Sequence, residues 1–148
     1  MPLKSSSLEE TAQIAACIAP LLQKTPCLLL RGGLGAGKTS FAKFLIHTLT
    51  KTPIDEIVSP TYNYVHLYEN SLAHFDLYRV QSRELLEELG LDELLQENTR
   101  IKVIEWPDIA LSLLPRNRLE ITINPCGRDE RLFSFCPLIL QEGSLILT

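Results

Sequence analysis

Apolar residues near the start of the chain recur with a helical period. The five apolar positions that share one predicted helical face are Leu8, Ala12, Ala15, Ala19 and Leu22. Two overlapping capping boxes, Ser6 with Glu9 and Ser7 with Glu10, fit the start of this helix. Pro20 is expected to kink or end it, because proline cannot donate the backbone hydrogen bond of a helix interior.

A continuous apolar run at residues 27–30 breaks this period. It lies between Pro26 and a group of glycines that begins at Gly32. A short, bounded apolar run of this kind predicts a buried strand. The next predicted helix is marked by Phe41, Phe44, Leu45 and Leu49.

The middle of the chain alternates between strand-like and helical patterns. Strands are predicted at residues 62–68, 72–78 and 101–104, the last one stopped by Pro107. Residues 84–95 have a helical composition, interrupted near Gly90.

The last third predicts a closing β-hairpin. Residues 119–123 alternate cleanly, and a turn at 124–127 leads to a second strand-like run at 132–135. Residues 137–148 are apolar and ambiguous. Buried strands that alternate with helices predict an α/β sheet covered on both faces.

Length and composition narrow the class of protein. A chain of 148 residues favours a single domain, residues 1–148, and the hydrophobic fraction of 45% is ordinary for a packed core. The longest apolar run, residues 15–22, contains Pro20 and is shorter than a membrane span. The amino terminus has no clear secretory signal. We therefore expect a cytoplasmic protein that does not engage a membrane.

Charge and cysteine usage exclude further classes. The formal net charge is −4, and residues 54–100 carry ten acidic and three basic side chains. No basic stripe of the kind that grips nucleic acid is visible. The four cysteines form no C-x-x-C pair and the three histidines are scattered, so neither a zinc site nor a disulfide framework is expected.

The glycines after the first predicted strand belong to a specific motif. Residues 32–39 read Gly-Gly-Leu-Gly-Ala-Gly-Lys-Thr and fit G-x-x-x-x-G-K-[ST], between a buried strand and a helix. Glycines let backbone N–H groups converge on phosphate oxygens, and the helix dipole adds to their effect. Lys38 is then expected to reach the β- and γ-phosphates, and the Thr39 hydroxyl to bind Mg²⁺.

Two carboxylates are candidates for a place beside this loop. Glu105 follows residues 101–104 at the carboxyl end of a predicted strand, where ligands bind in open α/β sheets. Asp76 follows the strand-like residues 72–75. A surface glutamate and a capping aspartate would fit the same two patterns. Residues 59–62, Ser-Pro-Thr-Tyr, are either a switch-like loop or a plain turn. The guanine-specific strings N-K-x-D and D-x-x-G do not occur, which favours ATP.

Four strings together resemble one family, TsaE, the ATPase of bacterial tRNA threonylcarbamoyladenosine biosynthesis. They are Leu-Gly-Ala-Gly-Lys-Thr at 34–39, Ser-Pro-Thr-Tyr at 59–62, His-Phe-Asp-Leu-Tyr-Arg at 74–79 and Ile-Glu-Trp-Pro at 104–107. The order and spacing cover about residues 8–135. The resemblance departs at Asp108, where the family often has glutamate.

The resemblance implies a fold, cofactors and partners. It implies a P-loop fold with a central mixed sheet flanked by helices, and ATP and Mg²⁺ at the loop. It also implies work with the TsaB–TsaD pair, which transfers a threonylcarbamoyl group to the adenosine beside the anticodon. The chain would use ATP hydrolysis to reset that complex and would meet tRNA only through it.

The resemblance also implies roles for individual residues. Thr39 and Glu105 become Mg²⁺ ligands, and Asp76 becomes a carboxylate needed for hydrolysis, acting with Lys38 and Glu105. Thr61 and Tyr62 lie in the switch-like loop. Thr11 and an arginine near the end, Arg128 or Arg131, become weaker nucleotide contacts. The loop residues expected to hold the nucleotide are Gly33, Leu34, Gly35, Ala36, Gly37, Lys38, Thr39 and Ser40.

Two other functions compete with this one. A small-molecule P-loop kinase would need a lid with two or more arginines, and Arg79, Arg83 and Arg100 are the candidates, although no arginine-rich string appears. A non-catalytic interaction module would use ATP binding alone to organise a partner surface.

Overall fold

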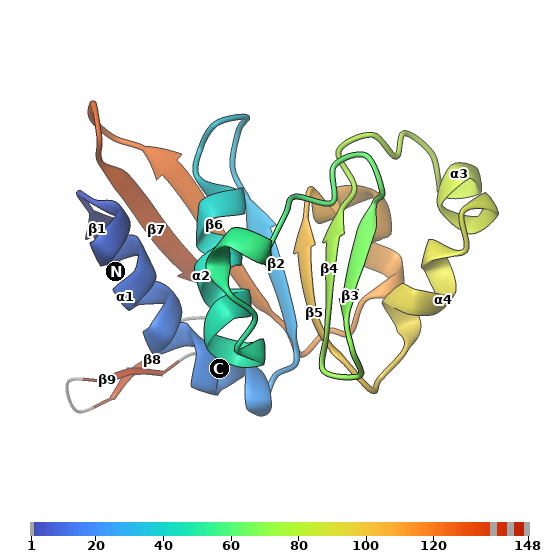
Figure 1. Cartoon of the computed structure of the whole chain (residues 1–148), viewed down its shortest axis with the longest axis horizontal. Helices are drawn as coiled ribbons and strands as arrows, with labels where there is room; N and C mark the ends of the chain where they lie inside the picture. Colours follow the sequence, from blue (N-terminus) through green and yellow to red (C-terminus); the bar gives the residue numbers. More distant parts are fainter. Residues whose placement is uncertain (1, 137–138, 142–143, 147–148) are drawn as a thin grey trace.

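A mixed seven-stranded sheet forms the centre of the computed structural model, which describes residues 2–136, 139–141 and 144–146 (Figure 1). From edge to edge the strands are β1 (Leu3–Ser5), β7 (Arg131–Cys136), β6 (Leu119–Pro125), β2 (Cys27–Arg31), β5 (Ile101–Glu105), β4 (Leu72–Asp76) and β3 (Val65–Tyr68). The four central strands, β6, β2, β5 and β4, are parallel to one another, whereas β3, β7 and β1 pair antiparallel with their neighbours. The expected mixed sheet and the β6–β7 hairpin are confirmed. Sequence patterns did not predict β1, nor the small separate sheet of β8 (Ile139–Gln141) and β9 (Ser144–Ile146).

Helices cover both faces of the sheet, as the sequence predicted. Alternate side chains of β2 divide between two cores: Leu28 and Leu30 pack in one, Cys27 and Leu29 in the other. The first core is closed by α1 (Leu8–Ile18) and α2 (Lys38–Thr50), which lie together over one part of the sheet in Figure 1. The second core is closed by α3 (Arg83–Glu88), α4 (Leu91–Gln96) and the 3₁₀ helix η3 (Pro107–Leu113). Two further 3₁₀ segments are η1 (Ala19–Gln23) and η2 (Ile54–Glu56).

The start of α1 is capped by the second of the two possible serines. Ser7 is the N-cap, its hydroxyl accepts the Glu10 N–H, and the Glu10 carboxylate accepts the Ser6 N–H. The predicted apolar face was wrong at its first residue, because Leu8 is 63% exposed. The buried residues of α1 are Thr11, Ile14, Ala15 and Ile18. The helix ends before Pro20, so Ala19 and Leu22 reach the core from η1, which turns with a different period.

Two strands are shorter than their patterns predicted. Strand β3 begins at Val65 rather than at residue 62, because a turn at Pro60, whose carbonyl accepts the N–H groups of Asn63 and Tyr64, occupies the residues before it. Strand β4 ends at Asp76, whose carboxylate accepts the Tyr78 N–H and turns the chain away. The predicted break at Gly90 is confirmed, because α3 and α4 meet there at φ 72°.

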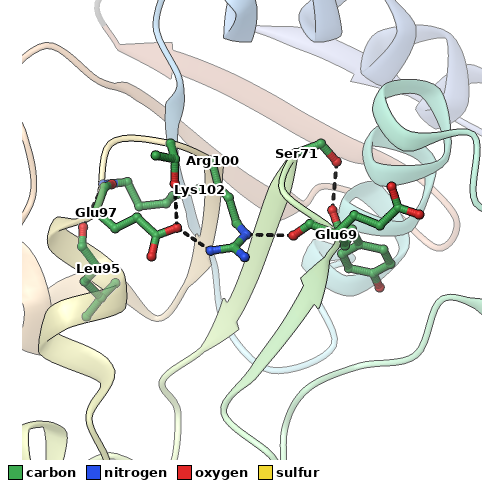
Figure 2. A network of polar contacts seen from close by, with 8 residues as sticks. Glu69, Ser71, Leu95, Glu97, Arg100 and Lys102 are labelled. Carbon is green, nitrogen blue, oxygen red and sulfur yellow. Dashed lines mark hydrogen bonds and ion pairs between the residues drawn. The ribbon is translucent and has the colours of Figure 1, made fainter.

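A network of polar contacts joins the start of β5 to the end of α4 and to the turn between β3 and β4 (Figure 2). The buried Lys102 ammonium donates to the carbonyls of Leu95 and Glu97 at 2.7 and 2.8 Å, at the end of α4. Arg100 pairs with Glu97 and donates to the carbonyl of Glu69 in the turn between β3 and β4. Burial lowers the pKa of Lys102. This buried lysine therefore has a structural role at the start of β5, away from the strand's carboxyl end.

Within the described residues, no helix has both the length and the apolar character needed to cross a membrane.

Candidate functional site

The carboxyl ends of three parallel strands bring distant parts of the chain to one edge of the sheet. Strand β2 leads into the glycine-rich loop, β4 ends at Asp76 and β5 ends at Glu105. The strand register pairs Asp76 with Glu105, and Glu105 with Leu30 just before the loop. The two candidate carboxylates therefore lie beside the loop, at the edge where α/β sheets bind ligands.

The loop depends on glycine at particular positions. Gly35 and Gly37 have φ of 73° and 107°, a region that side-chain-bearing residues rarely adopt. At Gly32, φ is 149° and an added Cβ would lie 2.5 Å from the carbonyl oxygen of Ile123. Gly37 is the N-cap of α2, so the free N–H groups of the helix's first turn face the loop. The local backbone is thus arranged to bind an anion.

Lys38 lies inside this loop and is 5% exposed. Its ammonium donates to the carbonyls of Gly32 and Gly33 at 2.7 and 2.8 Å, and lies 4.2 Å from the ring centre of Trp106. Burial lowers the pKa of Lys38, while the carboxylates of Glu105 and Asp76 act in the opposite direction. The Lys38 side chain is therefore held at the start of α2, between the loop carbonyls and the ring of Trp106.

Glu105 is fully enclosed, with 1% exposure, and both of its oxygens have partners. Oε1 accepts the Thr39 hydroxyl at 3.2 Å, and Oε2 lies 2.7 Å from Nε2 of His74, which is also completely buried. A buried carboxylate needs such partners because it has lost its hydration. The sequence motifs did not predict a role for His74. Its place two residues before Asp76 was the available signal, since alternate strand residues share a face.

Asp76 connects the site to the loop at residues 59–62. Its Oδ2 accepts the Thr61 hydroxyl at 3.0 Å, and the Thr61 and Ser59 hydroxyls lie 2.6 Å apart. Its Oδ1 accepts the Tyr78 N–H at 3.0 Å. Residues 59–62 form an irregular loop and turn, and this loop contacts the site through Thr61.

Most of the predicted site residues meet at one cavity of about 350 Å³, here called the loop cavity. Its lining residues are Leu34, Gly35, Ala36, Gly37, Lys38, Thr39, Ser40, Thr61, Asp76, Tyr78, Glu105, Trp106 and Arg131. Gly33 and Thr11 are not among them. Tyr78 is a lining residue that sequence analysis did not select, although it directly follows the Asp76-Leu77 pair.

Of the two candidate arginines, the structure brings Arg131 to the loop. Its Nε donates to the carbonyl of Ala36 at 3.0 Å, whereas Arg128 is exposed in the turn between β6 and β7. Arg131 also lines a second cavity of about 390 Å³, which shares Ala36, Gly37 and Ser40 with the loop cavity. Thr11 lines this second cavity, and its hydroxyl is 2.7 Å from that of Ser5 in β1.

The donor atoms at the loop cavity fit a hard cation. Thr39 and Glu105 present adjacent oxygen atoms, the kind of ligand that Mg²⁺ prefers. Among the described residues no group of three or more His, Cys, Asp and Glu side chains could hold a metal. A cation bound by Thr39 and Glu105 would therefore complete its coordination with water or ligand oxygens, as Mg²⁺ ordinarily does at phosphate sites.

Trp106 forms one wall of the loop cavity. It stacks at a tilt on Tyr78, with ring centres 4.8 Å apart, and has a left-handed backbone with φ 55°. Such a conformation is rare for a bulky residue and persists only where the surrounding structure holds it.

Comparisons with known proteins show the family of the chain. A sequence profile described as "Threonylcarbamoyl adenosine biosynthesis protein TsaE" matches residues 5–133. The chain is also similar to proteins named tRNA threonylcarbamoyladenosine biosynthesis protein TsaE. The protein of Rickettsia conorii is 36% identical, and the match covers 95% of this chain and 82% of the relative. The protein of Bacillus subtilis is 37% identical, and the match covers 86% of this chain and 79% of the relative. The crystal structure of Bacillus subtilis YdiB superposes with a TM-score of 0.64 at 29% identity, covering 91% of this chain and 83% of YdiB. Because the profile matches residues 5–133 and these relatives are matched over 79–82% of their own length, the chain belongs to the TsaE family of threonylcarbamoyladenosine biosynthesis proteins.

Proposed function

We propose that this chain binds ATP with Mg²⁺ in the loop cavity and hydrolyses it as an accessory protein of tRNA threonylcarbamoyladenosine synthesis. One observation carries the proposal. Lys38, Thr39, Asp76 and Glu105, which come from three segments of the chain, line the same cavity at the amino terminus of α2. A cation, a hydroxyl and two carboxylates around an anion-binding loop are the parts of a phosphoryl-transfer site.

Each of these residues has a distinct task in the proposal. Lys38 neutralises charge on the phosphates, and the loop N–H groups orient them. Thr39 and Glu105 hold Mg²⁺, which when bound offsets the charge that develops on the phosphoryl oxygens. Each oxygen of Asp76 has a second lone pair, so the carboxylate can orient a water molecule while it keeps its hydrogen bonds to Thr61 and Tyr78.

The second cavity is the proposed place for the nucleoside part of ATP. It joins the loop cavity through Ala36, Gly37, Ser40 and Arg131, so it lies next to the phosphate position. Its wall carries the Thr11 and Ser5 hydroxyls, which can hydrogen-bond to a ribose or a base.

The proposed partners are the TsaB–TsaD pair, with tRNA reached through them in the cytoplasm. The names of the relatives support the process, tRNA threonylcarbamoyladenosine biosynthesis. The acidic balance of the chain, with a formal net charge of −4, favours a protein partner over direct contact with the tRNA phosphates.

The geometry favours this function over a small-molecule kinase. Of the three arginines considered for a kinase lid, Arg100 is held in the network at the start of β5, and Arg83 donates to Ser112 and pairs with Glu87. Arg79 stacks on Tyr62, 4.4 Å from the ring centre. None of the three is a lining residue of the loop cavity.

Nucleotide binding is tested by calorimetry with a non-hydrolysable ATP analogue and Mg²⁺. Lys38→Ala is expected to weaken binding about a hundredfold or more, because a charge-assisted contact to phosphate is lost. Lys43→Ala removes a lysine elsewhere on α2 and serves as the matched control, with binding expected to be unchanged. Equal affinity in Lys38→Ala and the parent protein would rule out the loop as the phosphate site.

Hydrolysis is tested by phosphate release from ATP with the chain alone, with added metabolites, and with TsaB–TsaD. Stimulation by the protein pair supports the proposal. A phosphorylated metabolite would instead indicate a kinase, and tight binding without turnover under every condition would indicate an interaction module. Glu105→Gln keeps the side chain's shape but removes its charge, so Mg²⁺-dependent turnover is expected to fall while the fold is retained.

A further inference from the structure

His74 has a position in the sheet that the proposed chemistry has not yet used. It lies on β4, two residues before Asp76, and the register pairs it with Val103, two residues before Glu105. Alternate residues of neighbouring strands share a face, so His74 lies diagonally across from Glu105 beneath α2. It is 0% exposed, and its imidazole is therefore sealed from solvent.

The imidazole makes one polar contact, to the candidate metal ligand. Nε2 lies 2.7 Å from Oε2 of Glu105, while Nδ1 has no hydrogen-bond partner within the part of the chain that the structure describes. A proton on Nδ1 would leave a buried N–H group unsatisfied and would set the Nε2 lone pair against a carboxylate oxygen. A proton on Nε2 gives a hydrogen bond to a charged acceptor instead. The geometry therefore selects the form in which Nε2 carries the proton.

The two carboxylate oxygens of Glu105 have different partners, and this gives the hydrogen bond from His74 a function. His74 holds Oε2, and Oε1 is the oxygen that contacts the Thr39 hydroxyl at the loop cavity. We propose that His74 is a positioning residue, which holds Glu105 through Oε2 so that Oε1 is directed to the Mg²⁺ position beside Thr39. This inference rests on the proposed function, because it assigns the cation to these two residues.

The physical reason lies in the burial of the carboxylate. Glu105 at 1% exposure would be costly to keep charged and would be free to rotate if Oε2 had no donor. A fixed donor satisfies Oε2 and holds the carboxylate in one orientation, as outer partners of metal ligands commonly do. Loss of such a partner typically lowers metal affinity about 10- to 100-fold.

The first experiment separates a positioning role from simple packing. Affinity for a non-hydrolysable ATP analogue is measured over a Mg²⁺ titration and again in EDTA. In His74→Leu, the Mg²⁺ concentration for half-maximal effect is expected to rise about tenfold or more, with little change in EDTA. His74→Gln places an amide N–H₂ near the position of Nε2 and is expected to restore most of the Mg²⁺ response. The control is His66→Leu, the same change at the residue directly opposite on β3, and no change is expected.

The results that would overturn the inference are specific. If folded His74→Leu shows the parent's Mg²⁺ dependence, or loses affinity equally with and without Mg²⁺, His74 is only a packing residue. If the parent protein itself binds no nucleotide, or binds it without any effect of Mg²⁺, the proposed function fails and the metal-directing role fails with it.

A second measurement reads the position of the proton in the parent chain itself and uses a variant only to assign the signal. Long-range ¹H–¹⁵N correlation spectra of the labelled parent chain, without nucleotide, report which ring nitrogen of His74 carries a proton; His74→Gln assigns the signal. A proton on Nε2 supports the hydrogen bond to Glu105, and an unprotonated Nε2 overturns it. Because this spectrum does not depend on nucleotide binding, it distinguishes a failure of the inference from a failure of the proposed function.

Discussion

Lys38 is held in place by two loop carbonyls and by the face of Trp106. The contacts to Gly32 and Gly33 satisfy an ammonium that is nearly buried. The same ammonium is the group proposed to meet phosphate oxygens. Binding of a nucleotide is therefore expected to change the surroundings of Trp106, which lines the same cavity.

Trp106 is the only tryptophan, so its fluorescence reports this change without ambiguity. We expect a saturable change on titration with ADP or a non-hydrolysable ATP analogue, both with Mg²⁺, and a different amplitude for the two. The physical reason is the 4.2 Å contact with Lys38 and exposure to the cavity. The signal is expected to vanish in Lys38→Ala. A flat signal while calorimetry shows binding would mean that Trp106 belongs to the static core.

At the scale of elements, the turn from β2 into the loop passes very close to the backbone of β6. Strand β2 lies between β5 and β6, and the loop leaves it close to the β6 backbone at Ile123. Gly32 combines a positive φ with this close approach, whereas Gly33 has open space around its Cα. The two adjacent glycines therefore serve different purposes.

Gly32→Ala is expected to lower the free energy of unfolding by on the order of 2 kcal/mol, because a Cβ would lie 2.5 Å from a backbone oxygen and φ is 149°. Gly33→Ala is the matched control, and we expect its stability to change by less than about 0.5 kcal/mol. Urea denaturation followed by circular dichroism measures both. Equal stability of the two variants would show that the loop can shift away from Ile123.

Cys27 on β2 and its register partner Lys102 on β5 give a pH-dependent prediction. Burial raises the pKa of the Cys27 thiol from 9.0 to about 11, although Lys102 opposite it acts to lower it. At pH 8 this shift reduces the thiolate fraction about a hundredfold. Because thiolate is the reactive form, Cys27 is expected to react slowly with an aromatic disulfide reagent, and faster as the pH rises toward 11.

The other three cysteines, Cys17, Cys126 and Cys136, are exposed and are expected to react first. Three fast thiols and one slow thiol should therefore be counted in the native chain, and four fast ones in denaturant. Cys27→Ala should remove only the slow phase. Four equal rates in the native chain would contradict the burial of Cys27.

At the scale of the whole molecule, the site needs the far end of the chain. Strand β7 returns antiparallel to β6 and carries Arg131 to the loop, 95 residues after Ala36, whose carbonyl it contacts. The amino-terminal strand β1 then pairs with β7 and places Ser5 beside Thr11 at the second cavity. An early strand, β1, and a late strand, β7, thus both contribute to the surface around the loop.

Arg131→Ala is expected to weaken binding of the ATP analogue about tenfold, which corresponds to the loss of roughly 1.5 kcal/mol from one charged hydrogen-bonding group. Arg128→Ala removes an exposed arginine from the turn before β7, and affinity should stay within about twofold of the parent. Calorimetry on the two variants measures which arginine contributes to nucleotide affinity. A larger effect at Arg128 would mean that the turn, rather than β7, reaches the nucleotide.

Several features of this protein follow from local sequence alone. A helix cap at Ser6 or Ser7, of which the structure uses Ser7, and the break at Gly90 depend on residues within one or two turns of each other. The loop at 32–39 and the carboxylates at the ends of β4 and β5 can also be predicted from the sequence. The loop is one contiguous motif, and each carboxylate directly follows a contiguous strand-like run. Local spacing sets backbone conformation, and these features require nothing more.

Other features required the folded chain. The choice of Arg131 over Arg128, the pairing of β1 with β7, and the contact of His74 with Glu105 join residues far apart in sequence. The exposure of Leu8 belongs with them, since an apolar residue at the start of a helix is buried only if a neighbour covers it. Strand order and register decide which distant side chains share a face. No local pattern encodes them, because they are set by how the two cores pack around the whole sheet.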